Sequence, residues 1–435
     1  MRKQLQSPRG TRDILPEEQK YWHFLFEKVQ ENMGIFGAER LEPPIFEFAE
    51  TYLRTIGKGT DIVDKEMFEV RRLSTITADS LDEEENKLMV LRPEYTAGIA
   101  RAFIQNGMGN LPQPVKLWYF GPCFRYERPQ RGRFRIHHQF GIEVFGDDDP
   151  LTDAFLILLA LQSLKSFGIV TGLKLEINSL GCSVCRPKMK KRLVDYFQNF
   201  LEGLCPDCNR RYVENPLRIL DCKNEKCQKI ILGAPQVIDL LCEECKNHFK
   251  QVLENLDSLE IVYNLNPRLV RGLDYYTRTV FEITLASDKE NLTLLGGGRY
   301  DLLVQVLGGG ETPAAGWAAG VERIISALKE KNLLIPSRKF SDVCLIHMGE
   351  KARKQALSLL AKLSAANLRV TSIIGKESLK AQLRSASKLG AEICLILGQR
   401  EYLDKTVIFK DMTAGSQETV EQKKLVEFLK KRLNK

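Results

Sequence analysis

The alternating run at residues 134–144 constrains the fold of this chain more than any other feature of its sequence. Its even positions are mainly apolar, and its odd positions are Arg135, His137, Gln139, Gly141 and Glu143. Successive side chains of a strand point to opposite faces, so the run predicts a strand with one core face and one polar face. It forms the second arm of a hairpin predicted over residues 115–146, and its glycine would let a ligand approach the backbone closely.

A dense polar segment at residues 270–281 predicts a binding site. Its sequence is Val-Arg-Gly-Leu-Asp-Tyr-Tyr-Thr-Arg-Thr-Val-Phe, and we expect it to begin as an extended strand. It carries arginines, an aspartate and two tyrosines where a core strand would carry Val and Ile. Buried polar groups are costly unless they find partners. The segment therefore indicates a small, polar and charged ligand, and the alternative is a surface strand with ion pairs.

Arginines recur in the central region and favour a phosphate ligand. They lie in Phe124-Arg-Tyr-Glu127, in the basic turn 127–133, at Arg271 and in Gly320-Val-Glu-Arg323. The arginine fork matches phosphate oxygens, and Arg323 is predicted near the N-terminal end of a helix, where the backbone also favours anions. Each arginine alone could be a surface ion pair, and the usual phosphate-binding glycine loop followed by Lys-Ser/Thr is absent.

Eight of the eleven cysteines form four pairs, which are Cys182/Cys185, Cys205/Cys208, Cys222/Cys227 and Cys242/Cys245. The N-terminus lacks an apolar signal core, and no apolar run is long enough to cross a bilayer. We therefore expect a cytoplasmic protein without membrane contact, a setting in which disulfides are rare. Eight thiols suffice for two four-coordinate zinc sites, and ordinary reduced cysteines are the alternative.

The C-terminal part of the chain is predicted to be a separate basic domain after a linker at residues 331–340. Strands and helices alternate there, which indicates an α/β unit with a largely parallel sheet over 342–348, 350–366, 368–374, 378–389 and 392–397. Residues 337–435 contain 20 Lys and Arg against 10 Asp and Glu, and so carry the whole positive excess of the chain. This asymmetry favours a polyanionic partner, with a solvated lysine-rich surface as the alternative.

Several of these segments resemble the motifs of the histidyl-tRNA synthetases, a family of class II aminoacyl-tRNA synthetases. Residues 271–282 and Gly-Gly-Arg-Tyr-Asp at 297–301 resemble the two histidine-specific signatures of the family. Ser7-Pro-Arg-Gly-Thr-Arg-Asp13 resembles the N-terminal start of the family. Three further segments resemble the three class II motifs in order: the extended run ending near Pro44, Phe124-Arg-Tyr-Glu127, and Gly320-Val-Glu-Arg323. The resemblance covers essentially the whole chain, in the order typical of the family.

The resemblance implies a fold and a domain order. Residues 1–179 and 251–330 would form the catalytic core, an α+β class II domain with an antiparallel sheet flanked by helices. Residues 180–250 would be a cysteine-rich insertion near the acceptor arm of tRNA, and residues 341–435 an α/β anticodon-binding domain. Members of the family are homodimers, so a homodimer is expected here.

The resemblance also implies roles for individual residues. Glu94, Thr96 and Gln139 would hold the α-amino group of histidine, Glu143 and Tyr276 would bind the imidazole nitrogens, and Tyr275 and Tyr300 would line the pocket. Arg125 would bind the α-phosphate of ATP with Glu127 beside it, Arg323 the γ-phosphate, and Arg271 the charge that develops during attack. Contacts to the tRNA acceptor end would come from Arg128, Gln130, Arg131 and Arg135.

Two further points concern the residues around this implied site. The alternating run agrees with the assignment, because it already places Gln139 and Glu143 on one polar face. Tyr95, however, stands where the family usually has glycine. The five histidines show no nucleophile or base arrangement, so we expect core or surface positions for His23, His137, His138, His248 and His347.

These implications together predict a histidine–tRNA ligase. L-histidine and ATP, the latter as its Mg²⁺ complex, would form histidyl-adenylate, and the histidyl group would pass to the 3′ end of tRNA(His). Zinc in the insertion would be structural. One alternative is a synthetase-like regulatory subunit of histidine biosynthesis, which the intact signatures and C-terminal region disfavour. The other is a zinc-ribbon nucleic-acid-binding protein with a vestigial core, which the retained Arg125, Arg271 and Arg323 disfavour.

Overall fold

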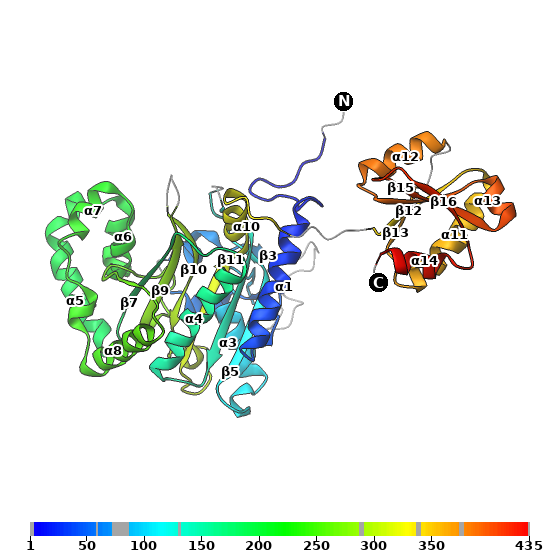
Figure 1. Ribbon diagram of the computed structural model, residues 1–435. Coiled ribbons are helices and arrows are strands. Elements are labelled where there is room, and N and C mark those ends of the chain that lie inside the picture. The colour runs from blue at the N-terminus through cyan, green and yellow to red at the C-terminus, as the bar shows by residue number, and fades with distance from the viewer. Residues whose placement is uncertain are drawn as a thin grey trace. The chain divides into compact units, whose positions relative to one another are not determined.

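The computed structural model describes residues 4–57, 60–71, 87–128, 132–286, 291–335, 341–373 and 378–433. The chain divides into two compact units, Met1–Ile335 and Pro336–Lys435, and each unit has its own sheet (Figure 1). Residues 82–87 (Asp-Glu-Glu-Glu-Asn-Lys), whose run of charges predicts the tip of a hairpin, lie outside the described residues except for Lys87. The second half of the predicted linker also lies outside them. Among the described residues, no helix combines the length and apolar character needed to cross a lipid bilayer.

An eight-stranded sheet organises the first unit. Its strands, in spatial order, are β1 (Glu39–Arg40), β5 (Val115–Phe124), β6 (Ile136–Phe145), β11 (Ala314–Gly320), β10 (Leu292–Arg299), β9 (Thr277–Leu285), β7 (Leu173–Ser179) and β8 (Asn264–Leu265). Neighbours from β5 to β7 are antiparallel, whereas β1 and β8 pair in parallel at the two edges. The predicted antiparallel core is thus confirmed, within a sheet that is mixed at its edges.

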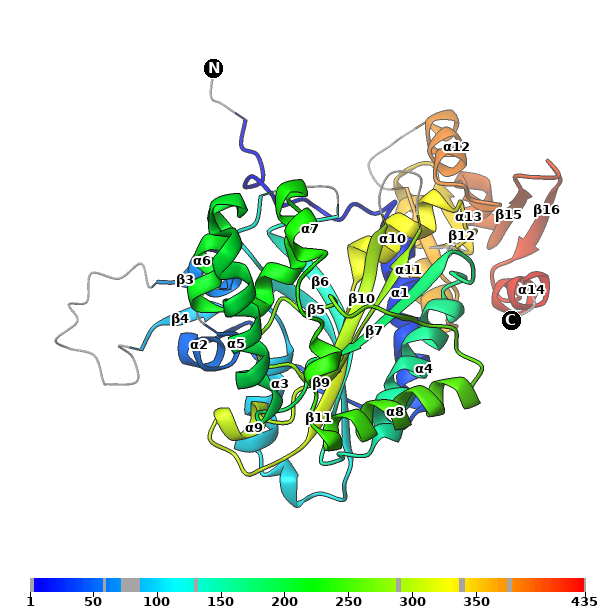
Figure 2. The same cartoon turned by 90° about the vertical axis from the view of Figure 1, so that its left-hand side faces the viewer.

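One face of this sheet is covered by the helices α1 (Gln19–Ile35), α4 (Pro150–Ser166), α8 (Glu243–Ser258) and α10 (Val321–Glu330) (Figure 2). The even residues Phe140, Ile142 and Val144 of β6 are buried against them, as the alternation predicts. Helix α4 begins at Pro150 after Asp149, whose carboxylate accepts from the Leu151 amide at 2.8 Å and caps the helix. This helix is apolar on most sides because it packs against the sheet, α1 and α8.

The other face carries the odd residues of β6 and is only partly covered. Elements on this side are α2 (Ala49–Thr55), α3 (Thr96–Gln105), α9 (Leu303–Val306), the short π-helix Ile62–Glu66, and a small sheet of β2 (Phe46–Phe48), β4 (Met89–Leu91) and β3 (Glu69–Val70). Side chains of this face join a second core, which includes Ile99, Phe103, Tyr119 and Phe145. The open part of the face is where a ligand has access to the sheet.

The segment that begins at residue 270 differs from the prediction, because β9 starts only at Thr277. Residues 270–276 form turns instead of a strand. The physical reason is that Tyr275 and Tyr276 both line the same cleft, although they are adjacent in sequence. Adjacent side chains of a strand point to opposite faces, so an extended segment could not direct both rings to one site.

The insertion between β7 and β8 is helical. It consists of α5 (Cys185–Phe197), α6 (Pro206–Glu214) and α7 (Glu225–Ile231), with short 3₁₀ turns at Gln198–Gly203, Pro216–Asp221 and Val237–Leu240, and it returns to the sheet through α8. Its interior combines the cysteines with buried apolar side chains, namely Met189, Leu193, Phe197, Leu204, Leu217, Ile219, Leu220, Ile231, Val237 and Leu241.

The second unit confirms the predicted alternation of strands and helices and the parallel pairing of its three predicted strands, and it adds a hairpin that was not predicted. Its strands, in spatial order, are β13 (Val370–Ser372), β12 (Val343–His347), β14 (Ile393–Leu397), β15 (Thr406–Asp411) and β16 (Gln417–Glu421). The helices are α11 (Glu350–Ala365), α12 (Leu379–Lys388), α13 (Gln399–Asp404) and α14 (Leu425–Arg432). Only the first three strands are parallel; β15 and β16 form an antiparallel hairpin whose polar, exposed second arm gave no strand signal.

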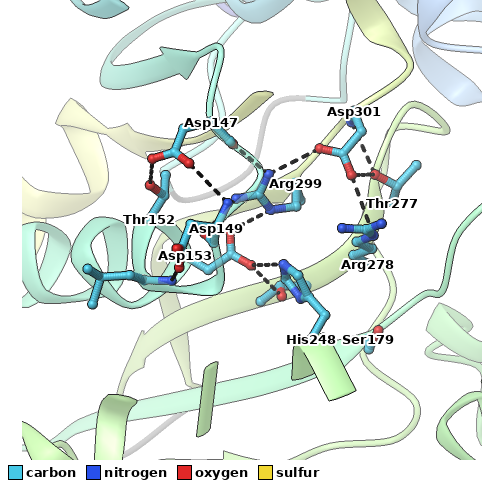
Figure 3. A network of polar contacts seen from close by, with 12 residues as sticks. Asp147, Asp149, Thr152, Asp153, Ser179, His248, Thr277, Arg278, Arg299 and Asp301 are labelled. Atoms are coloured by element: carbon cyan, nitrogen blue, oxygen red, sulfur yellow. Dashed lines mark hydrogen bonds and ion pairs between the residues drawn. The ribbon is translucent and has the colours of Figure 1, made fainter. Parts of the chain in front are cut away.

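A buried network of polar side chains connects the large sheet to helix α4 (Figure 3). Arg299 of β10, which is fully buried, donates to the Asp153 carboxylate of α4 at 2.8 Å and to Asp301 at 3.2 Å. The same guanidinium donates to the carbonyls of Asp147 and Asp149, just before α4 begins. Because its donors are matched by fixed acceptors, the arginine of the second signature joins sheet and helix and does not reach the cleft.

We predict that Arg299→Met lowers the free energy of unfolding of the first unit by about 3–5 kcal/mol, since it leaves the Asp153 carboxylate buried without its cation. The control is Arg54→Met, which breaks an exposed ion pair with Glu50 and should change stability by less than about 1 kcal/mol. Chemical denaturation of both variants measures the difference. Equal stability of the two variants would contradict a structural role for Arg299.

Candidate active site

A cleft opens on the partly covered face of the large sheet. It is lined by residues from β6, β9, β10 and β11, from the segments before α3 and β9, and from the insertion. Nine residues that the sequence assigns to the site line it together: Glu94, Thr96, Arg125, Glu127, Gln139, Arg271, Tyr275, Tyr276 and Arg323. Segments far apart in the chain therefore converge on one site.

Glu143 and Tyr300 lie buried beside this cleft and support it. Each side chain is 1% exposed, and the Tyr300 hydroxyl donates to the Glu143 carboxylate. Thr96 Oγ1 donates to the other carboxylate oxygen at 2.7 Å. Burial raises the pKa of Glu143 to about 8, against the opposing effect of these hydrogen bonds. The carboxyl group therefore holds its proton at neutral pH in this state.

A second buried carboxylate, Glu94, sits at the start of α3. It accepts from the amides of Thr96 and Ala97 at 2.7 and 2.9 Å, which satisfies two free donors of the first helical turn. Burial raises the pKa of Glu94, although these backbone hydrogen bonds act in the opposite direction. Two carboxyl groups near one polar cavity favour a ligand that bears N–H groups, because carboxyl oxygens accept hydrogen bonds in either protonation state.

Tyr95 is buried and is not among the residues that line the cleft, although it stands where the family usually has glycine. Its ring stacks on Tyr119 with centroids 4.2 Å apart, and Arg92 donates to its hydroxyl at 2.6 Å. Gly121 provides the space, since a Cβ there would lie 2.2 Å from the Tyr95 hydroxyl oxygen. The flanking Glu94 and Thr96 keep their places in the cleft.

Three of the four arginines that line the cleft, those with predicted roles, are held by neighbouring acceptors. Arg271 donates to Glu282 at 2.6 Å; burial alone would lower the pKa of Arg271, but Tyr276 and Glu282 raise it above the usual value. Arg125 donates from Nε to the Pro93 carbonyl at 2.9 Å, and its Nη1 lies 3.8 Å from Glu127. Arg323 donates to the Thr293 carbonyl at 2.9 Å. Several fixed guanidinium groups in one cleft favour a phosphorylated ligand.

Several lining residues were missed by the sequence analysis, namely His137, Asp221, Lys223, Glu282 and Thr293. The alternating run contained a signal for His137, which shares the polar face of β6, yet a core or surface position was expected for it. Burial and nearby Arg125 hold the pKa of His137 well below its usual value, so it is neutral. Glu282 and Thr293 come from separate strands, and no local pattern of the sequence brings them together.

The residues expected to contact tRNA are less well defined. Arg128, near the start of the basic turn, is exposed. Gln130 and Arg131 lie outside the described residues. Arg135 instead packs within the protein: its guanidinium lies 3.6 Å from the centre of the Tyr126 ring and donates to the Arg9 carbonyl at 3.1 Å. Its contact with tRNA therefore stays a prediction.

The eight paired cysteines form two clusters in the insertion. The outer cluster consists of Cys182, Cys185, Cys242 and Cys245, and the inner cluster of Cys205, Cys208, Cys222 and Cys227. In each cluster all four sulfur atoms lie within 4.8 Å of one another. In chain order, the first cysteine pair therefore clusters with the fourth pair, and the second pair clusters with the third.

Comparisons with known proteins agree with this geometry. The family model for histidyl-tRNA synthetase matches residues 10–183 and 222–324, and that for an anticodon binding domain matches residues 342–432. A histidine–tRNA ligase of Pelotomaculum thermopropionicum is 42% identical over 98% of this chain and 97% of its own length. One from Dehalococcoides mccartyi is 41% identical over 98% of this chain and 100% of its own length.

Solved structures extend the comparison. The apo histidyl-tRNA synthetase of Staphylococcus aureus matches with a TM-score of 0.80 and 33% identity, covering 98% of this chain and 100% of its own. A Bacillus halodurans protein described as an ATP phosphoribosyltransferase regulatory subunit/histidyl-tRNA synthetase shares the fold, with a TM-score of 0.61 and 21% identity over 90% of this chain and 98% of its own. The chain belongs to the histidyl-tRNA synthetase family.

Proposed function

We propose that this chain is a histidine–tRNA ligase, which forms histidyl-adenylate from L-histidine and ATP and transfers the histidyl group to the 3′ end of tRNA(His). The observation that carries this proposal is the convergence of the buried Glu94 and three of the predicted arginines on one cleft, with the buried Glu143 beside it. The test is histidine-dependent exchange between ATP and pyrophosphate by the full-length protein. Exchange with histidine alone among the amino acids supports the proposal, and its absence would overturn it.

The histidine part of the site would lie over Glu143. Glu94, Thr96 and Gln139 would meet the α-amino group, and Glu143 and Tyr276 would meet the imidazole. Tyr275 and Tyr300 would line the pocket. These three tyrosine rings pack on one another, with centroids 4.8 to 6.1 Å apart. Such a wall excludes water and strengthens hydrogen bonds to the bound side chain.

The nucleotide part would lie among the arginines. Arg125, beside Glu127, would bind the α-phosphate, and Arg323 the γ-phosphate, where it is already aligned by the Thr293 carbonyl. Mg²⁺ would enter with ATP and offset part of its charge. Arg271 would meet the charge that develops as the histidine carboxylate attacks the α-phosphorus, so its contribution belongs mainly to the transition state.

For Arg271→Ala we expect the rate of adenylate formation to fall at least a hundredfold, the effect of losing about 2.7–4 kcal/mol of electrostatic stabilisation. Histidine affinity should change much less, because the arginine acts on developing charge. Arg268→Ala, an exposed neighbour, is the control. Pre-steady-state kinetics and calorimetry measure the two quantities, and lost affinity at a near-normal rate would refute this role.

Glu143 should make histidine binding pH-dependent. Its pKa of about 8 means that the carboxyl is protonated below that pH, whereas an imidazole N–H needs the ionised acceptor. Histidine affinity should therefore rise about fivefold from pH 7 to pH 8 and level off above. Glu143→Gln, which cannot ionise, should bind more weakly and lose this rise, while exposed Glu42→Gln keeps it. An unchanged profile in Glu143→Gln would remove Glu143 from the pocket.

Transfer to tRNA would use further parts of the chain. The anticodon-binding unit carries the positive excess of the chain, and the basic turn with Arg128, Gln130, Arg131 and Arg135 would approach the acceptor end. We also propose a cytoplasmic homodimer, which sedimentation of the purified protein would test. The non-charging regulatory alternative is less well supported, because the chain includes the anticodon-binding unit.

Truncation after Ile335 is expected to spare histidine-dependent pyrophosphate exchange and to impair charging of tRNA strongly. The cleft lies entirely within the first unit, whereas the removed unit would hold the anticodon stem-loop. The loss should grow with salt concentration, because the remaining phosphate contacts are screened. Comparable charging by truncated and full-length protein at all salt concentrations would rule out this role for the C-terminal unit.

We propose that each cysteine cluster binds a structural zinc ion. With Zn–S bonds of ~2.3 Å, a tetrahedral site separates its sulfur atoms by about 3.8 Å. Cys182 and Cys185 are 3.8 Å apart, Cys182 and Cys242 3.9 Å, and Cys205 and Cys222 3.8 Å. Backbone amides also donate to sulfur, from Cys242 to Cys185 at 3.0 Å and from Cys205 to Cys227 at 3.2 Å. Zinc would cross-link the helices and short turns of the insertion, so that metal binding and folding of this region are coupled.

Protein purified without chelator should contain two zinc atoms per chain by elemental analysis. Cys245→Ser in the outer cluster and Cys208→Ser in the inner cluster should each lower this number to about one, because the clusters are separate. Removal of the metal should make the insertion sensitive to protease and weaken tRNA charging. Metal-free protein with a protease-resistant insertion would show that the clusters are ordinary reduced cysteines.

A further inference from the structure

The inner cysteine cluster lies next to the proposed synthetase site. Cys222 is flanked by Asp221 and Lys223, and both neighbours line the cleft. The family model does not match residues 184–221, which include two of the four inner cysteines, so the family match assigns no role to this cluster. A ligand that binds Cys222 would therefore act on a wall of the cleft.

The segment before Cys222 also supports the residue expected to be catalytic. Arg218, which is 7% exposed, donates to the Arg271 carbonyl at 3.4 Å. The Arg218 carbonyl in turn accepts from Arg211 at 3.4 Å, and Arg211 also donates to Asp61, beside the cleft residue Ile62. The insertion thus contacts two core segments that border the cleft.

Most cationic side chains of the cleft form an ion pair with a carboxylate among the described residues, whereas Lys223 does not. Arg271 is paired with Glu282 at 2.6 Å, and Arg125 and Arg133 share Glu127 at 3.8 and 3.3 Å. Lys223 is exposed, and its one carboxylate neighbour on this wall is Asp221, with no direct ion pair between them in the described part of the chain. Burial raises the pKa of Asp221, and the Lys223 ammonium lowers it in part. A triphosphate or a polynucleotide end needs cations that are not already neutralised by carboxylates, and a lysine ammonium binds phosphate as a point charge.

We propose that the inner cluster is a positioning metal site: the metal held by its four thiols fixes residues 218–223, so that Lys223 binds a phosphate group in the cleft. The proposal rests on the proposed function, since the phosphate belongs either to ATP or to the 3′ end of tRNA. Lys223 would contact the phosphate directly, whereas the cluster would act only by holding the polypeptide that carries Lys223.

The first test compares Lys223→Ala with Lys226→Ala, an exposed lysine in the first turn of α7 that does not line the cleft. Calorimetric titration with ATP and the KM for tRNA in charging are measured for both. Lys223→Ala should weaken one of the two by roughly tenfold, the effect of one lost charged contact, and Lys226→Ala neither. Weaker ATP binding identifies ATP as the source of the phosphate, and a raised KM for tRNA alone identifies tRNA. No change in either quantity overturns the proposal.

The second test asks whether the metal acts through Lys223. Cys205→Ser should lower zinc from two atoms to about one per chain and weaken the same phosphate contact. Adding Lys223→Ala to Cys205→Ser should then have little further effect, because groups that act as a unit are not additive. Fully additive losses would overturn the coupling. Wild-type protein without histidine-dependent exchange would instead overturn the proposed function, so the two failures are distinguishable.

Discussion

The buried Glu143 carboxyl group is the feature on which the rest of the site depends. It lies between Thr96 and Tyr300, which join α3 and the second signature to β6. Its position requires glycine at residue 316 of the neighbouring strand, where a Cβ would lie 1.9 Å from the Glu143 carboxylate. A polar group this deeply buried is tolerated only because its partners are fixed, and those partners in turn fix the cleft.

Buried polar groups with fixed partners also connect larger elements of the first unit. Arg299 binds the start of α4 to β10, and insertion residues brace the turns before β9. The turns carry Arg271, Tyr275 and Tyr276, whose convergence a regular strand could not provide. Rigid sheet and buried polar contacts therefore hold the charged groups of the cleft in place before a ligand arrives, which lowers the reorganisation needed for reaction.

Much of this arrangement could be predicted from local sequence patterns. Alternation in β6 correctly placed Gln139 and Glu143 on one face, and the position of Arg323 at the start of α10 followed from its sequence context. Glu282 and Thr293 could not be found in this way, because they meet Arg271 and Arg323 only through strand register. Cysteine spacing likewise predicted two clusters but not which pairs combine, because this depends on how the helices of the insertion fold back. The β15–β16 hairpin was missed because its second arm is polar and exposed.

A crystal structure of the protein with histidine and a non-hydrolysable ATP analogue tests the central claim most directly. The account predicts the imidazole against Glu143 and Tyr276, the α-phosphate at Arg125, and the reacting carboxylate between that phosphate and Arg271. An imidazole bound away from Glu143, or a triphosphate that contacts none of the three arginines, would contradict it.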